Sequence, residues 1–186
     1  MKKLTMMFAL LLSIFVMAQS EDEKLPYYEI PNHPENYTAG TVAARMADGL
    51  GFRYYWATEG LRSEDLVHKA SESGRTSAET IDHILGLSNF ILSSVSKEGK
   101  RTKQDEKRSF EEKRKQTLLN FKEASDILRA MDDVSQFDND RFPFWNIING
   151  PIADALWHCG QVVMLRRASG NPFNSKVSVF TGKVNE

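Results

Sequence analysis

Residues 151–170 read PIADALWHCGQVVMLRRASG, and this stretch decides the fold prediction because it reads as a helix that is apolar almost all the way round. Proline suits the first turn of a helix, so we expect the helix to start near Pro151 with Asn149 or Gly150 as its cap. Two arginines and a glycine are typical of the opposite end. A helix that is apolar over about 200° of its circumference is buried on several sides. It should therefore pack against several other helices.

The same helix carries an acid and an imidazole one turn apart. At about 100° per residue, Asp154 and His158 project within about 40° of each other, and Gln161 lies on their other flank. Such a polar stripe faces either solvent or a cavity between helices. The helix alone leaves both interpretations open.

Three further helices are predicted upstream. Apolar and small residues at helical spacing indicate a first helix over about 39–61. The second starts at the capping box Thr76-Ser77-Ala78-Glu79 and runs to about residue 95. The third has an apolar stripe that continues to Met131. Four long helices without a sustained strand pattern predict an all-α protein built as a four-helix bundle.

The segments between these helices are polar or irregular. Residues 97–116 hold nine basic and five acidic side chains, which we interpret as a loop and the solvated first half of the third helix. A basic patch for an anionic partner is the alternative. Residues 62–75 read as a polar connection and 132–145 as a loop rich in aromatic residues. The alternation at 177–180 is too short to predict a sheet.

The N-terminus reads as a secretory signal peptide over residues 1–18, with two lysines, a short apolar run and a small-residue cleavage site before Gln19. An uncleaved membrane anchor is the alternative. An irregular leader (19–37), the bundle (38–175) and a tail (176–186) would follow. We therefore expect a bacterial protein that is periplasmic or secreted, without stable membrane insertion after cleavage.

Charge and cysteine content limit the partners. The chain has 24 Lys and Arg against 25 Asp and Glu, and loss of the two lysines in residues 1–18 leaves 22 basic groups and a net charge of −3. This balance gives no reason to expect a nucleic acid partner. Cys159 is the only cysteine, which excludes an internal disulfide, and we interpret it as a small buried apolar residue.

His83 adds a possible third ligand to the Asp154 and His158 pair. It lies in the middle of the second predicted helix and is flanked on its own side by apolar residues. A lone histidine on such a face is usually a core histidine with one hydrogen bond. Helical bundles, however, build metal sites from one histidine on one helix and an acid–histidine pair on another. Two imidazoles and one carboxylate suit Zn²⁺, Fe²⁺, Ni²⁺ or Mn²⁺.

Two motifs resemble one family. The string His158-Cys159-Gly160-Gln161, continuing to Ser169-Gly170-Asn171-Pro172, resembles the fourth helix of the DinB-like superfamily of bacterial bundles. Residues 76–84, TSAETIDHI, resemble that family's second helix. The resemblance covers roughly Thr38 to Pro172. It implies a four-helix bundle with a long crossover and a metal site formed by a histidine of the second helix and a His-x-x-x-His-Arg-Gly-Gln motif of the fourth.

The chain departs from this pattern at two positions. Asp154 stands where the family has the first histidine of the pair, and Cys159 stands in place of the arginine. The resemblance thus implies a site of His83, Asp154 and His158, which is harder than an all-imidazole site and favours Fe or Mn, or else a site that has lost its metal. It also implies that Gln161 orients a ligand or bonds to the first helix.

Two functions follow as expectations. One is a metal-dependent hydrolase or transferase acting on an unknown small molecule. The other is a non-catalytic bundle that binds a small ligand or a partner, with no metal or only a structural one. In that case the aromatic residues at 54–56 and 137–145 would line the pocket. A homodimer is compatible with either.

Overall fold

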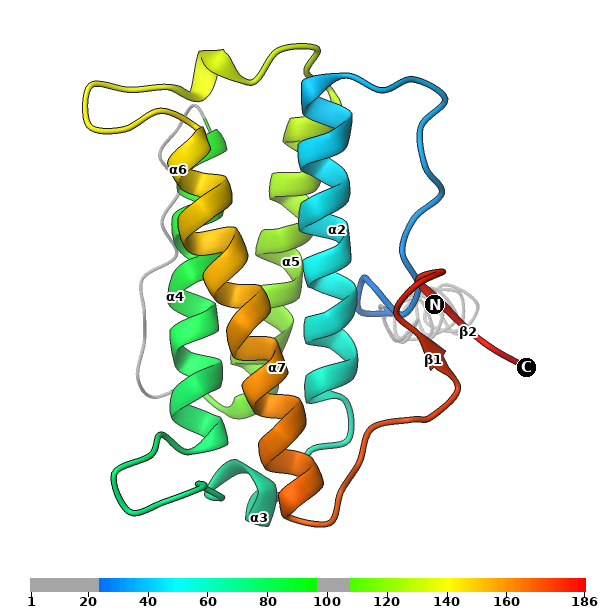
Figure 1. The fold of residues 1–186 in the computed structure, drawn as a ribbon, viewed down its shortest axis with the longest axis vertical. Coiled ribbons are helices and arrows are strands. Elements are labelled where there is room, and N and C mark those ends of the chain that lie inside the picture. Colours follow the sequence, from blue (N-terminus) through cyan, green and yellow to red (C-terminus); the bar gives the residue numbers. More distant parts are fainter. Residues whose placement is uncertain (1–23, 97–107) are drawn as a thin grey trace, which may run out of the picture.

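The computed structural model describes residues 24–96 and 108–186. The predicted signal peptide and residues 97–107 of the basic segment lie outside this range. Within it the chain is mainly helical, as the sequence predicts (Figure 1). The four long helices of the described residues lie side by side: α2 (Ala39–Thr58), α4 (Ser77–Val95), α5 (Phe110–Arg129) and α7 (Ala153–Ala168).

The four helices form a closed ring of contacts around one core. Helix α2 packs against α5 and α7, and α4 packs against the same two helices from the other side (Figure 1). The core between them consists of large, fully buried side chains, which include Leu50, Phe52, Tyr54, Ile81, Ile84, Ile91, Leu118, Phe121 and Leu128. This arrangement brings α4 next to α7, although the chain passes through α5 between them.

Side-chain caps fix the starts of three helices. At α4, the Thr76 hydroxyl accepts from the Glu79 N–H at 3.1 Å, and the Glu79 carboxylate accepts from the Thr76 N–H at 2.7 Å. This is the predicted capping box. Thr38 before α2 and Ser109 before α5 cap in the same reciprocal way.

The charged first half of α5 is not solvated throughout, which corrects one expectation. Arg114 is buried, donates to the Thr58 hydroxyl at 3.0 Å and forms an ion pair with Glu59. Its guanidinium carbon also lies 4.7 Å from the centroid of the Tyr55 ring. Arg114 is buried because its partners at the end of α2 neutralise and satisfy its charge.

The fourth helix begins earlier than predicted. Helical turns run continuously through α6 (Trp145–Ile147), a π-helical turn η2 (Ile148–Ile152) and α7, so Pro151 lies inside the helix and not at its start. In a regular helix the proline ring would clash with the carbonyl four residues earlier. The wider π turn removes this clash, and the Ala153 N–H bonds to the Ile148 carbonyl five residues back. The predicted capping role of Asn149 or Gly150 is therefore wrong.

The tail is more regular than predicted. Strand β1 (Val177–Ser178) pairs antiparallel with β2 (Lys183–Val184). The turn between them uses Gly182 at a φ of 70°, which glycine adopts without strain, and the Gly182 carbonyl accepts from the Ile30 N–H at 2.9 Å. This hydrogen bond joins the tail to the leader.

Two short elements lie in the connections, α3 (Ser63–Leu66) and the 3₁₀ turn η1 (Ser135–Phe137). Helix α2 ends at Thr58, three residues before the predicted end, and Gly60 then turns the chain with a φ of 67°. In the described ranges, none of the helices has the length and apolar character needed to cross a membrane.

Candidate metal centre

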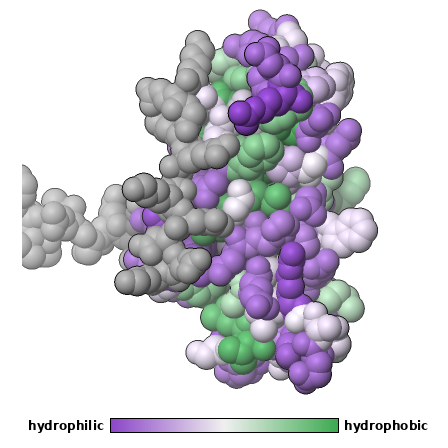
Figure 2. All heavy atoms as spheres, turned by 90° about the vertical axis from the view of Figure 1, so that its left-hand side faces the viewer, coloured by the Kyte–Doolittle hydropathy of each residue, from purple (hydrophilic) through white to green (hydrophobic). Residues whose placement is uncertain are grey.

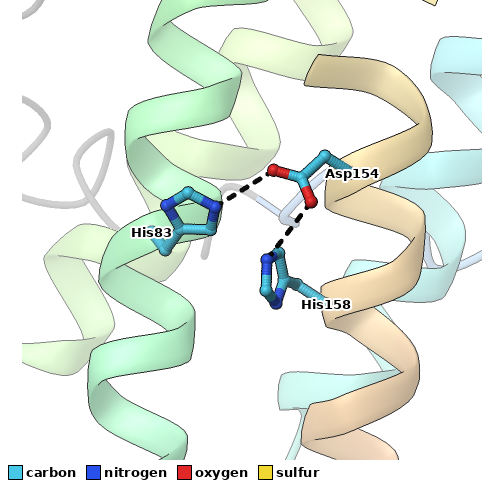
Figure 3. Close-up of side chains that lie close together, drawn as sticks. All are labelled: His83, Asp154 and His158. Atoms are coloured by element: carbon cyan, nitrogen blue, oxygen red, sulfur yellow. Dashed lines mark hydrogen bonds and ion pairs between the residues drawn. The ribbon is translucent and has the colours of Figure 1, made fainter. Parts of the chain in front are cut away.

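The structure brings His83, Asp154 and His158 together. His83 projects from α4, whereas Asp154 and His158 project from the first two turns of α7, and all three side chains point toward one another (Figure 3). The Asp154 carboxylate lies between the two imidazoles. Its Oδ2 is 3.1 Å from His83 Nε2, and its Oδ1 is 3.3 Å from His158 Nε2.

These separations are close to those of a metal-ligand set. One ligand atom from each residue can be chosen such that all lie within 4.8 Å of one another. Bonds of about 2.1 Å in tetrahedral geometry place ligand atoms about 3.4 Å apart. The two imidazole rings are nearly perpendicular, at 87° with centroids 4.5 Å apart, and each presents its Nε2 to the Asp154 carboxylate.

Gln161 fixes the orientation of His158. Its Oε1 lies 2.8 Å from His158 Nδ1. This contact holds the ring with Nε2 toward the Asp154 carboxylate, where a metal ion between the two side chains could bind both.

The π turn determines the direction in which α7 projects Asp154 and His158. It contains one more residue than a regular turn, and it ends two residues before Asp154. Without the extra residue, Asp154 and His158 would be rotated by about 100° relative to the buried Phe144 and Ile147 before the turn. Their direction toward α4 therefore depends on the π turn that Pro151 favours.

The centre is half open to solvent. The exposed fractions of the side chains are 35% for His83, 42% for Asp154 and 12% for His158. Beside it lies a groove of about 760 Å³, bounded by His158, Gln161, Trp157, Met164 and Arg75 among others. Figure 2 shows the side of the molecule on which α4 lies, where hydrophobic areas alternate with hydrophilic ones.

Sequence reasoning found His158 and Gln161 but missed other residues that border this groove. Trp157 and Met164 are 73% and 64% exposed, although the apolar character of the helix predicts burial on several sides. The available signal was the seven-residue spacing that puts both on one face of α7. Cys159, which projects about 100° away from His158 on α7, is buried, and burial raises the pKa of its thiol to about 12.

The aromatic residues expected to line a pocket have divided roles. Tyr54 and Phe144 are part of the buried core, Trp145 is 71% exposed, and Trp56 borders a cavity between α2 and α7. Phe137 and Phe142 border another hollow near the end of α4.

No protein-family model matches this chain, and neither the curated proteins nor the solved structures gave a significant match.

Proposed function

We propose that this chain is an exported protein with a DinB-like four-helix bundle in which His83, Asp154 and His158 hold one divalent transition metal ion. The convergence of these three side chains, with one ligand atom from each within 4.8 Å of the others, is the observation that carries the proposal. The ring of four long helices supports the bundle. The two family motifs lie on α4 and α7, the two helices that supply the ligands.

The donor set defines the class of ion. Imidazole nitrogens suit Zn²⁺, Fe²⁺ and Ni²⁺, and the Asp154 carboxylate extends the range toward Mn²⁺. Three protein ligands leave at least one coordination position for water or substrate, as in catalytic zinc sites, whereas structural sites are usually closed by four. The exposure of His83 and Asp154 agrees with an open position.

An open site next to a groove favours a metal-dependent hydrolase or transferase. A bound ion lowers the pKa of a coordinated water or thiol and polarises a substrate oxygen. The protein itself would hold His158 in one orientation through Gln161. It would also receive a small substrate in the groove bordered by Trp157 and Arg75.

One observation favours a second candidate, a non-catalytic bundle. Asp154 already contacts both imidazoles at hydrogen-bond distances, so protons on the two Nε2 atoms would satisfy the whole cluster without a metal. In that case the cluster would be a polar network that joins α4 to α7.

Metal binding distinguishes the two candidates. The purified protein, stripped with a chelator and titrated with Zn²⁺ against a fluorescent chelating competitor, should bind about one ion per chain. His158→Ala should weaken binding by at least a hundredfold, because it removes a ligand, and Gln161→Leu by about ten- to a hundredfold. His33→Ala is the matched control, since His33 is an exposed histidine of the leader. Equal affinity in His158→Ala and His33→Ala would exclude this site as the metal site.

Activity and export need separate tests. A screen of the metal-loaded protein for hydrolase and thiol-transfer activity should find turnover that His83→Ala and Asp154→Ala abolish. Turnover that persists in both variants must come from elsewhere.

Export is tested by N-terminal sequencing of the protein recovered from a bacterial periplasm. The recovered chain should begin at Gln19, and an intact Met1 would contradict cleavage.

A further inference from the structure

A second cavity lies between α2, α7 and the tail, on the opposite side of α7 from the candidate metal centre. Its volume is about 360 Å³, within the range of about 300 to 1,000 Å³ that is usual for small-molecule sites. Apolar side chains form most of its walls: Phe52 and Trp56 from α2, Leu156 and Val163 from α7, and Phe173 and Val177 from the tail. The Trp56 indole N–H donates to the Tyr28 carbonyl, so it needs no partner in the cavity.

Two arginines border this apolar cavity, one from each helix. Arg53 on α2 donates to the Gly49 carbonyl at 2.9 Å, and the Arg167 guanidinium on α7 lies 5.5 Å from the centroid of the Phe173 ring. Neither arginine has an ion pair with an acidic residue in the ranges 24–96 and 108–186. A guanidinium has five N–H donors, so most of the donors on both side chains remain available.

The described residues bring no negative group to the cavity. None of its bordering residues is acidic, and its remaining titratable side chain, Cys159, is a buried neutral thiol. The pKa of this thiol is raised by burial, while the nearby charge of Arg53 acts in the opposite direction. An apolar chamber with two positive charges that no acidic side chain of the described ranges pairs complements a ligand with an apolar body and an anionic end.

We propose that this cavity binds a small amphipathic carboxylate, with its hydrocarbon part against Trp56 and Val163 and its carboxylate between Arg53 and Arg167. The site is independent of the metal centre, since none of its bordering residues is a candidate metal ligand. It gives the protein a second ligand site that the metal proposal does not require.

Titration calorimetry with octanoate tests the proposal. The protein is stripped of metal and carries His158→Ala, so that octanoate cannot bind as a metal ligand. Octanoate should bind with about one site per chain, 1-octanol at least tenfold more weakly because it lacks the charge, and acetate not measurably because it lacks the apolar body. Equal affinity for octanoate and octanol, or no binding of either, would overturn the proposal.

Substitutions locate the binding site. Arg53→Gln and Arg167→Gln should each weaken octanoate binding about tenfold or more, whereas Arg141→Gln, an exposed arginine outside the cavity, should not. Val163→Phe should block binding by filling the cavity. If both cavity arginines can be replaced without loss of affinity, octanoate binds elsewhere. If instead octanoate does not bind and Val163→Phe dissociates a dimer, the cavity is an interface between two copies and the proposal is wrong.

Trp56 reports occupancy directly. The chain has three tryptophans, and Trp145 and Trp157 are exposed, so Trp145→Phe with Trp157→Phe leaves Trp56 as the only one. In this background 8-bromooctanoate should quench the tryptophan fluorescence in a saturable manner, and octanoate should reverse the quenching. Quenching that rises linearly without saturation would show collisional contact only and would refute binding at Trp56.

Discussion

Replacement of Arg166 by methionine should strongly destabilise the protein, because this side chain ties the end of α2 to α7. Arg166 is 2% exposed and lies on the last full turn of α7. Its Nη1 donates to three carbonyl groups at the C-terminus of α2, those of Trp56, Ala57 and Glu59, at 3.0, 3.1 and 2.9 Å. The last carbonyls of a helix have no partner within the helix, so Arg166 supplies what the helix lacks. Its Nε also donates to the Asn171 carbonyl at 2.7 Å.

The magnitude follows from opposing contributions. A buried polar group left without a partner costs about 1–3 kcal/mol. The substitution removes the hydrogen bonds that Arg166 donates to three such carbonyls. Burial of the guanidinium itself costs free energy, which is why burial lowers the pKa of Arg166, and methionine does not incur that cost. Water reaches the Glu59 end of the helix, which is half-buried. We therefore expect a net loss of about 3 kcal/mol from a stability of about 5–15 kcal/mol.

Urea unfolding followed by circular dichroism measures this loss. With a slope of about 2 kcal/mol per molar urea, the midpoint should fall by about 1.5 M. The control is Arg167→Met, which removes an adjacent arginine that is exposed and contacts the Phe173 ring. It should cost about 1 kcal/mol or less. Equal midpoints for the two variants would refute the view that Arg166 caps α2.

Three further predictions concern other parts of the fold. The Arg62 guanidinium, 2.8 Å away, holds the pKa of Asp65 well below its usual range. The pair therefore stabilises the fold above about pH 4, and this contribution is lost as the pH falls through the lowered pKa. Asp65→Asn should flatten the loss of unfolding free energy that acid titration measures. Cys159 should resist alkylation at pH 8 in the native protein and react within minutes in urea, and rapid labelling of native protein would contradict its burial. Gly51→Ala should cost about 1–3 kcal/mol in thermal or urea unfolding because its Cβ would lie 2.4 Å from the Tyr27 ring, whereas Gly49→Ala should be neutral or stabilising; the reverse order would show that Tyr27 does not pack there.

The helices were predictable because their signals are local. The capping box of Thr76 and Glu79 forms as the sequence indicates, since both partners lie within one turn. The start of the fourth helix was not predictable. Pro151 is normally a signal for a first turn, and only the packing of Ile147 and Phe144 in the core holds the preceding residues in helical turns.

The burial of two arginines could not be predicted from the sequence either. Arg114 and Arg166 are arginines in segments that read as a solvated surface and a helix end, yet both are buried. Each has partners at the end of α2, more than fifty residues away in the chain. No local pattern shows that an arginine will meet carbonyls or carboxylates on another helix, because that depends on how the helices pack.

The candidate metal centre also has a part that the sequence predicts and a part that depends on packing. The sequence by itself determines that Asp154 and His158 adjoin, because a four-residue spacing places them on one face of any α-helix. It also proposes His83 as their partner, through residue types and resemblance. Only the tertiary structure decides that His83 reaches Asp154 across 71 residues of chain, because that contact depends on α4 packing against α7 and on the π turn that aims the first turn of α7. The geometry within a helix depends on nearby residues, whereas the contact between two helices depends on the packing of the whole core.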